Sequence, residues 1–499
     1  MAVWLPIRST NDFDKLYETG LSPLDFALAE VTQWCRLYLS GAVKGILVEY
    51  PYVDKDYRST YYNYYAKKGI AYDSYCARLH LFRGGVTFEA PVSSLRINGR
   101  PRDATDDELT RKYLGFVTLR PTKRHTIGRT VINPAGIRGA KGQIIVSRHK
   151  AHVLGHRLQV RGFPFMQQHS DIAVCAHTVC WAILRHYSER YASYGEILLH
   201  RIARLGREFE PGGLLPSLGI SARDAERVFA AAGTYPLLVY DGEPSSGSEP
   251  EAHTANISAR FSDELLAYLE SGFPLFGIFA DRPHVASIIG YRSRSTPVVE
   301  SGPHVRAADF LSHLIVSNDN TQPYEALSRK KAPKVGGISG ISGFIVPLPE
   351  KMFLPAAKAI KHATDLLRHP PDEFEDLAEL KDLVSRCFVT TTAAWQRFVR
   401  VQAAILPVEF VRSAFQLTTP QFLWICEFAR PGQRAQRTIH ARLLLDATAG
   451  AEDAFPAFLI HDRKSALWFD RAQREPMRYT EFSTPVGSFK EVSGNLGTY

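Results

Sequence analysis

The chain has 499 residues, of which 45% are hydrophobic and 22% are charged, and its formal net charge is +9. This length exceeds one compact core, so two or three domains of a soluble globular protein are expected. No apolar run approaches the roughly 18 residues of a membrane span, and the N-terminus lacks the features of a signal peptide. The six cysteines show no zinc spacing. We therefore expect free thiols, no cofactor and a cytoplasmic location.

The first of four regions, residues 1–108, mixes helix and strand signals. A helix is expected over 23–40 and a strand over 45–53, from the spacing and type of the apolar residues. The stretch 56–82 is crowded with tyrosine. Such a stretch is more typical of a core or an interface surface than of a platform for stacking bases.

The second region, residues 109–165, is predicted to form short strands broken by Gly and Pro. Between Leu109 and Ser170 the chain has twelve Lys or Arg and no Asp or Glu. Such a segment could attract nucleic acid or an acidic partner. The alternative, which we favour from sequence alone, is a strand-rich region whose cations are simply solvated.

The third region, residues 166–350, contains a run of apolar residues at helical spacing over 175–187. The spacing predicts a helix that begins at Cys175 and packs on one side. Ser170 and Asp171 are the candidate capping residues just ahead of it.

Helices and strands are expected to alternate through the remainder of this region. Ser221 is predicted to cap a helix that ends at Gly233, and Ser262 one that ends at Gly272. The expected strands are 235–240, 274–280, 284–291 and 312–319. The expected loops are a polar one at 242–256 and a basic, Gly-rich one at 328–343.

The fourth region, residues 351–499, is predicted to be helical at first and then strand-rich. Helices are expected over 351–369 and 372–388. Strands are expected at 421–430, 437–447 and 465–471. The region shows no catalytic spacing.

Three residues of the third region form a candidate catalytic set. Cys175 begins a helix, where the helix dipole favours thiolate over thiol. His284 opens a strand and Asp319 closes the next one. A thiol enzyme needs an imidazole to take its proton and a third group to orient that imidazole. Side chains at strand ends can project into a common cleft, so these three could meet.

This order resembles the papain-like cysteine peptidase superfamily, and most closely its branch of bacteriocin-leader-processing peptidases. The similarity covers roughly residues 160–348. It includes a glutamine ahead of the cysteine, as in Gln168, and a His-led strand that closes with Gly290 and Tyr291. The resemblance implies an α+β fold whose core is a helix packed on an antiparallel sheet.

Carried over position by position, the resemblance implies a role for each residue. Cys175 would be the nucleophile, His284 the general base and acid, and Asp319 the orienting group. Gln168 would donate to an oxyanion hole beside the N–H of Cys175. The implied reaction is hydrolysis of a peptide or isopeptide bond in a protein or peptide substrate, through an acyl-enzyme.

The sequence departs from the family's pattern in two places. Ala176 stands where this branch often has glycine. The connection between Tyr291 and Asp319 has 27 residues, which is longer than the usual short hairpin.

Three further residues compete for these roles. Gln167 could replace Gln168, and Asn318 could replace Asp319. Cys180 is followed by Trp and Ala, as the papain nucleophile is, but it points about 140° away from the first cysteine on the helix. It also lies among the apolar positions of the helix, so a core role is expected for it.

Two other functions stay open at this stage. The same triad could transfer the acyl group to an amine, as a transglutaminase or acyltransferase does. Alternatively, the protein binds nucleic acid through residues 109–170 and uses the papain-like region only as a scaffold. The sequence carries no signal for the oligomeric state.

Overall fold

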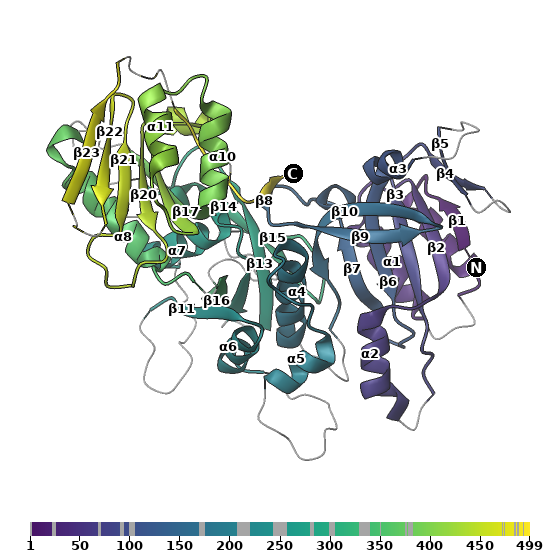
Figure 1. The fold of residues 1–499 in the computed structure, drawn as a ribbon. Coiled ribbons are helices and arrows are strands. Elements are labelled where there is room, and N and C mark those ends of the chain that lie inside the picture. The colour runs from purple at the N-terminus through teal and green to yellow at the C-terminus, as the bar shows by residue number, and fades with distance from the viewer. Residues whose placement is uncertain are drawn as a thin grey trace.

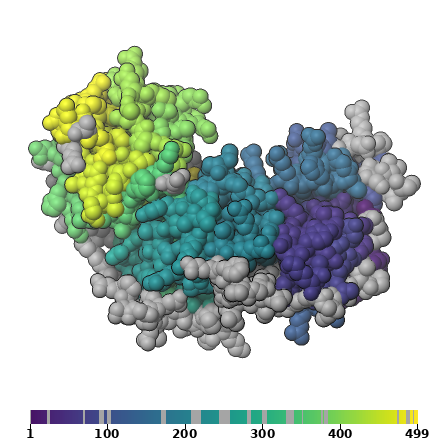
Figure 2. Space-filling view, turned by 60° about the horizontal axis from the view of Figure 1, so that its bottom comes forward, coloured from purple at the N-terminus to yellow at the C-terminus, as the bar shows by residue number. Residues whose placement is uncertain are grey.

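The computed structural model describes residues 2–21, 26–67, 71–89, 94–98, 105–168, 175–206, 220–242, 257–279, 284–298, 305–328, 340–349, 351–374, 377, 383–471, 473, 475–483, 486, 489–492 and 494–499. It has a mixed α+β fold with three large antiparallel sheets, as the sequence predicted for the fold class. The N-terminal sheet, the central sheet and the C-terminal sheet lie in a row (Figure 1). Figure 2 shows the same row from another side, with the purple N-terminal residues and the yellow C-terminal residues at opposite ends. Among the described helices, none combines the length and apolarity that crossing a membrane requires.

The N-terminal sheet has the strand order β1-β2-β3-β6-β7-β10-β9. These strands span Ala2–Pro6, Gly45–Tyr52, Cys76–Phe82, Tyr113–Leu119, Ile127–Ile132, His156–Phe165 and Ser147–Val153, respectively. Because β3 pairs with β6, the boundary expected at residue 108 falls inside this sheet. A short helix, α3 (Asp106–Lys112), lies at this boundary and leads directly into β6.

Two helices cover parts of this sheet. The helix expected over 23–40 is found as α1 (Leu28–Tyr38), although residues 22–25 lie outside the described residues. The tyrosine-rich stretch contains α2 (Lys55–Asn63). Tyr57, Tyr64 and Tyr65 pack into a buried cluster with Cys76, as the core interpretation of this stretch predicted. Tyr62 and Tyr75 are exposed.

Helix α4 (Cys175–Arg190) begins at the predicted residue and lies between the N-terminal and central sheets (Figure 1). The prediction that it packs on one side is wrong. Every side chain from Ala176 to Tyr187 is buried, including those of His177 and Arg185. A helix covered on all sides needs no polar face, and here both sheets and neighbouring helices supply the cover.

The central sheet has the order β11-β16-β12-β13-β14-β15, and β13 also pairs with β8, which in turn pairs with β25. The strands span Thr234–Tyr240, Ile341–Pro349, Leu275–Phe279, His284–Ser293, Leu311–Ser317, Glu325–Ser328, Gln143–Ile144 and Gly497–Thr498, respectively. All four strands predicted in this region are therefore found. The loops expected at 242–256 and 328–343 lie largely outside the described residues.

The helices beside the central sheet are α5 (Leu199–Leu205), α6 (Ala222–Ala231) and α7 (Ala259–Glu270). Ser221 caps α6 as predicted, by accepting a hydrogen bond from the N–H of Asp224. The predicted cap of α7 is wrong: Ser258 caps that helix, and Ser262 lies inside it. The helix starts earlier than the apolar pattern suggested, because Ser258 lies just ahead of the first turn and accepts from the N–H of Phe261.

The C-terminal sheet has the order β17-β18-β20-β21-β22-β23. Its strands span Val384–Thr391, Phe422–Ala429, Ala441–Asp446, Ala457–His461, Ser465–Asp470 and Glu475–Glu481, respectively. The helices of this part are α8 (Ala356–Arg368), α10 (Thr392–Gln402), α11 (Val408–Gln416) and α12 (Pro431–Ala435). The helix predicted over 372–388 is wrong from Val384 onward, because β17 pairs along its whole length with β18.

The last residues of the chain return to the central sheet. β24 (Phe489–Lys490) pairs with β19 (Thr438–Ile439), and β25 then pairs with β8. The backbone N–H groups of Gly142 and Tyr499 each donate to the carbonyl of the other residue at 2.9 Å. The C-terminus therefore lies between the N-terminal and C-terminal parts (Figure 1).

A buried ionic cluster joins α4 to the N-terminal region. The Oδ1 of Asp56, in α2, accepts hydrogen bonds from Trp181 Nε1 and Arg185 Nη2, each at 2.9 Å. Asp54 caps α2 and pairs with Arg78 of β3 at 3.0 Å. Burial raises the pKa of Asp56, and the positive charge of Arg185 opposes that shift.

Arg129 lies beside this cluster and is not a surface cation. Its Nη1 is 4.0 Å from Asp56 Oδ2, and only 13% of its side chain is exposed. The interpretation of the basic segment as solvated cations therefore does not hold for Arg129, whereas Lys123 and Arg124 are exposed as that interpretation requires.

We expect Asp56→Ala to lower the free energy of unfolding by about 3–5 kcal/mol, because removing one partner of a buried pair leaves the other charge uncompensated. The control is Asp14→Ala, which removes the acid of an exposed pair with Arg36 and should cost less than about 1 kcal/mol. Urea unfolding followed by tryptophan fluorescence measures both. Equal effects of the two substitutions would contradict the role given to Asp56.

Candidate active site

Cys175 occupies the first position of α4, and its side chain is half-buried, whereas the other five cysteines are buried. Its sulfur lies close enough to the N–H of Val285 to accept a hydrogen bond. Val285 follows His284 at the start of β13, so the start of this helix meets the start of this strand. The predicted caps, Ser170 and Asp171, lie outside the described residues.

His284 contacts both candidates for the orienting group. Its Nε2 lies 3.1 Å from Oδ1 of Asn318, at hydrogen-bonding distance. The same Nε2 lies 3.9 Å from Oδ1 of Asp319, which is an ion-pair distance. Asn318 therefore makes the hydrogen bond, and Asp319 supplies a nearby charge.

The surroundings of Asn318 fix which way its amide points. Its Nδ2 lies 2.7 Å from a carboxylate oxygen of Glu325, which can only accept when ionised. The backbone N–H of Asn320 lies 3.1 Å from its Oδ1, which must be the acceptor. Because Oδ1 also faces His284, the imidazole Nε2 carries the proton and donates it. The neutral ring then has its unprotonated nitrogen at Nδ1, which can accept a proton from a thiol.

Asp319 is buried, with only 2% of its side chain exposed. Burial raises the pKa of this carboxyl from 3.8 to about 7, and the N–H groups of Asp319 and Asn320 oppose only part of that shift. Asp319 therefore changes its charge in the neutral pH range, beside His284.

The two glutamines have different partners. Gln167 is buried: its Oε1 accepts from the N–H of Ile127, and its carbonyl accepts from Arg120. The Gln168 side chain instead donates from Nε2 to Oδ1 of Asn320, at 2.9 Å. Gln168 is thus the glutamine that reaches the loop beside Asn318, while Gln167 is bound to the N-terminal sheet.

The pKa of Cys175 differs from expectation. Burial raises the pKa of this thiol above its ordinary value. The N–H groups of Val285, Ala176 and Cys175 lower it, and the charge of Asp319 raises it. The lowering expected from the helix start is present in the N–H groups of Cys175 and Ala176, but partial burial outweighs it. In this state the thiol keeps its proton until a base removes it.

Cys180 and His177 both lie in the core. Each has a fully buried side chain, and burial raises the pKa of the Cys180 thiol. Neither residue presents a reactive atom to solvent, which agrees with the core position expected for Cys180.

Two residues of this network were not singled out in the sequence. Glu325 orients Asn318 and also accepts from the hydroxyl of Thr321 at 2.7 Å. The carbonyl of Thr321 accepts from Trp34 Nε1 of α1 at 2.8 Å, so the N-terminal region supports this loop. The only sequence signal for them is the run of polar residues at 318–321, directly after a strand.

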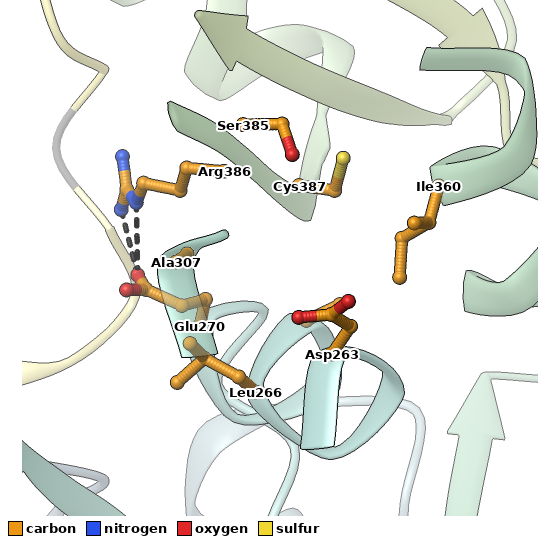
Figure 3. Close-up of a pocket in the computed structure, with 9 residues that line it drawn as sticks. Asp263, Leu266, Glu270, Ala307, Ile360, Ser385, Arg386 and Cys387 are labelled. Carbon is orange, nitrogen blue, oxygen red and sulfur yellow. Dashed lines mark hydrogen bonds and ion pairs between the residues drawn. The ribbon is translucent and has the colours of Figure 1, made fainter. Parts of the chain in front are cut away.

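A pocket in another part of the protein lies between α7 and β17 (Figure 3). Its lining includes Asp263, Ser385 and Cys387. None of the candidate catalytic residues lines it. In the part of the chain that the structure describes, no group of three or more His, Cys, Asp or Glu side chains is arranged to hold a metal ion.

No protein family and no curated protein sequence matches the chain.

Asp319→Asn should flatten the pH dependence of stability. The folded protein keeps the Asp319 proton up to about pH 7, whereas the unfolded chain releases it near the ordinary value of 3.8. The free energy of unfolding of the wild type should therefore fall as the pH rises between these values, by up to about 1.4 kcal/mol per pH unit. Urea unfolding over a pH series measures this slope.

The matched control is Asp14→Asn, at an exposed carboxylate. It should keep the wild-type slope. An Asp319→Asn variant with the same slope as the wild type would show that this carboxyl does not titrate in the way its burial implies.

Proposed function

We propose that the protein is a papain-like cysteine peptidase, which hydrolyses a peptide or isopeptide bond through an acyl-enzyme on Cys175. One observation carries the proposal. Asn318 holds His284 through Nε2, and the N–H of the next residue, Val285, reaches the sulfur of Cys175. A nucleophile, a base and an orienting group with these contacts are the requirements of thiol catalysis.

In the first half of the reaction, His284 Nδ1 takes the proton of Cys175 and the sulfur attacks the carbonyl carbon of the substrate. The carbonyl oxygen becomes an oxyanion, which accepts from the N–H of Cys175 and from the second N–H of the Gln168 side chain. The first N–H of that side chain is held by Asn320. The C–N bond then breaks, the amine leaves with the proton from His284, and a thioester remains.

In the second half, His284 takes a proton from water and the resulting hydroxide attacks the thioester. The C–S bond breaks, the carboxylic acid leaves, and the proton returns to the sulfur. His284 is positively charged after each proton abstraction. When ionised, Asp319 stabilises that imidazolium from 3.9 Å, while Asn318 keeps the ring oriented.

The arrangement of elements also supports the proposal. α4 packs against β13, and the antiparallel strands β12, β13 and β14 follow in the order that the resemblance implies. The long connection before Asn318 holds a 3-10 helix (Ala307–Phe310) that leads into β14. Across this insertion β13 and β14 still pair, with register shifts near Gly290 and Ser293.

Cys175→Ala should abolish cleavage without unfolding the protein, because the side chain is half-buried and carries the attacking atom. Cys180→Ala should keep activity and lower the free energy of unfolding by about 1 kcal/mol, as the loss of a small buried group does. A proteome-wide comparison of cleavage products, with melting curves of both variants, measures the two effects. Cleavage by Cys175→Ala would overturn the proposal, and amine incorporation in place of hydrolysis would assign the site to acyl transfer.

The two neighbouring candidates for the orienting group should differ in effect. We expect Asn318→Ala to lower kcat by roughly 10²-fold or more, because the ring loses the acceptor that fixes its tautomer. Asp319→Asn should cost less at neutral pH, because the hydrogen bond from Nε2 survives. Steady-state kinetics on a substrate found in the cleavage comparison would show which variant loses more of its kcat. A larger loss of kcat in Asp319→Asn than in Asn318→Ala would assign the orienting role to Asp319.

A further inference from the structure

Strands β9 and β10 form a ribbon with a positively charged outer face. On β9, Arg148, Lys150 and His152 are exposed, and they alternate with buried residues. On β10, Arg157, Gln159 and Arg161 are exposed in the same alternation. Their buried neighbours pack into the core cluster on one face of the N-terminal sheet. The outer face therefore presents four permanent cations, one histidine and one glutamine to solvent.

The register of the two strands sets two arginines opposite each other. Arg148 is the direct partner of Arg161, and His152 is the direct partner of Arg157. Lys150 lies opposite the neutral Gln159. Like charges in direct cross-strand pairs destabilise a sheet. The ribbon thus carries an arrangement that lowers the stability of the fold.

Acids do little to neutralise this face. The chain has no Asp or Glu from Leu109 to Ser170, so no acid lies on the ribbon itself. At its turn, Asp106 of α3 lies 3.0 Å from His156 Nδ1 and close to Arg157. At the opposite end, Arg161 lies near Tyr499. Asp106 therefore offsets part of the charge at the turn, next to one of the four permanent cations.

The ribbon is narrow as well as charged. β9 is the last strand of its sheet, and of β10 only Phe163, Pro164 and Phe165 pair with β7. Residues 156–162 of β10 therefore pair with β9 alone among the described residues. In Figure 1 the two strands lie side by side along the upper side of the N-terminal part.

We propose that the outer face of the β9–β10 ribbon binds duplex DNA in its major groove. The major groove of B-form DNA admits a two-stranded β-ribbon, whereas the deep, narrow major groove of duplex RNA does not. The arginines and the lysine neutralise phosphates, and Gln159 at the centre is a residue type that hydrogen-bonds adenine edges. This binding site goes beyond the proposed peptidase activity and does not rest on it.

The test measures binding of a fluorescent DNA duplex of about 20 base pairs by anisotropy between about 50 and 200 mM salt. In the triple variant Arg148→Gln, Lys150→Gln and Arg161→Gln, affinity should fall, and the slope of log K against log salt should shrink by about 2–3. The matched control removes three exposed arginines of α10 and α11, through Arg397→Gln, Arg400→Gln and Arg412→Gln. That control should bind like the wild type.

Three results would overturn the proposal. The first is an unchanged affinity and salt slope in the ribbon variant, with circular dichroism showing that it is folded. The second is binding of duplex RNA as tight as that of duplex DNA. The third is competition by polyglutamate that equals competition by unlabelled DNA at the same charge concentration, which would assign the face to an acidic protein.

Discussion

The carboxylate of Asp56 connects the N-terminal sheet to the helix that carries Cys175. It is buried, and it accepts hydrogen bonds from Trp181 and Arg185 of α4. The helix that carries Asp56, α2, is held to β3 by the pair of Asp54 with Arg78. Arg185 lies about 15 Å along the helix from Cys175, at 1.5 Å per residue. The ion pairs of Arg185 with Asp56 and Glu196 thus limit both rotation and sliding of α4. These contacts of Trp181 and Arg185, further along α4, keep the N-terminal end of the helix in place against β13.

A second constraint acts on the base. His284, Asn318 and Glu325 come from β13, the residue after β14, and β15, which are neighbours in one antiparallel sheet. The pairing of Val316 with Glu325 brings that carboxylate back to Asn318 across the loop 318–324. The register of β15 against β14 therefore sets the tautomer of the His284 imidazole, although β15 lies two strands away from β13. Transfer of the thiol proton to the ring depends on that tautomer.

Local signals in the sequence located the cysteine, the histidine and the adjacent residues Asn318 and Asp319, but they did not decide between those two. Helical spacing marks the start of α4, and strand composition marks β13. The choice between Asn318 and Asp319 depends on how β14 lies against β13, where the register shifts near Gly290. Such irregularities depend on tertiary packing, so a single sequence does not show them. Consecutive side chains at a strand end point in different directions, and one residue of register decides which reaches the ring.

The same limit explains the other differences between sequence and structure. The stretch 372–388 contains many helix formers, yet pairing with β18 makes its last part a strand. The pKa of Cys175 was expected from the helix terminus alone, but the cover provided by the surrounding elements dominates it. Local propensity identified most elements, and the contacts between distant segments decided the remainder.

The pairing of residues 497 and 498 with β8 has a consequence for folding. β8 bridges β13 and β25, so one edge of the central sheet combines segments that are about 350 residues apart in the sequence. Closing a loop of that length costs conformational entropy before the new pairing offsets it. The strands of the N-terminal sheet are closer together in the sequence. We therefore expect the pairing of β25 with β8 to be a late step in folding, after the N-terminal sheet has formed.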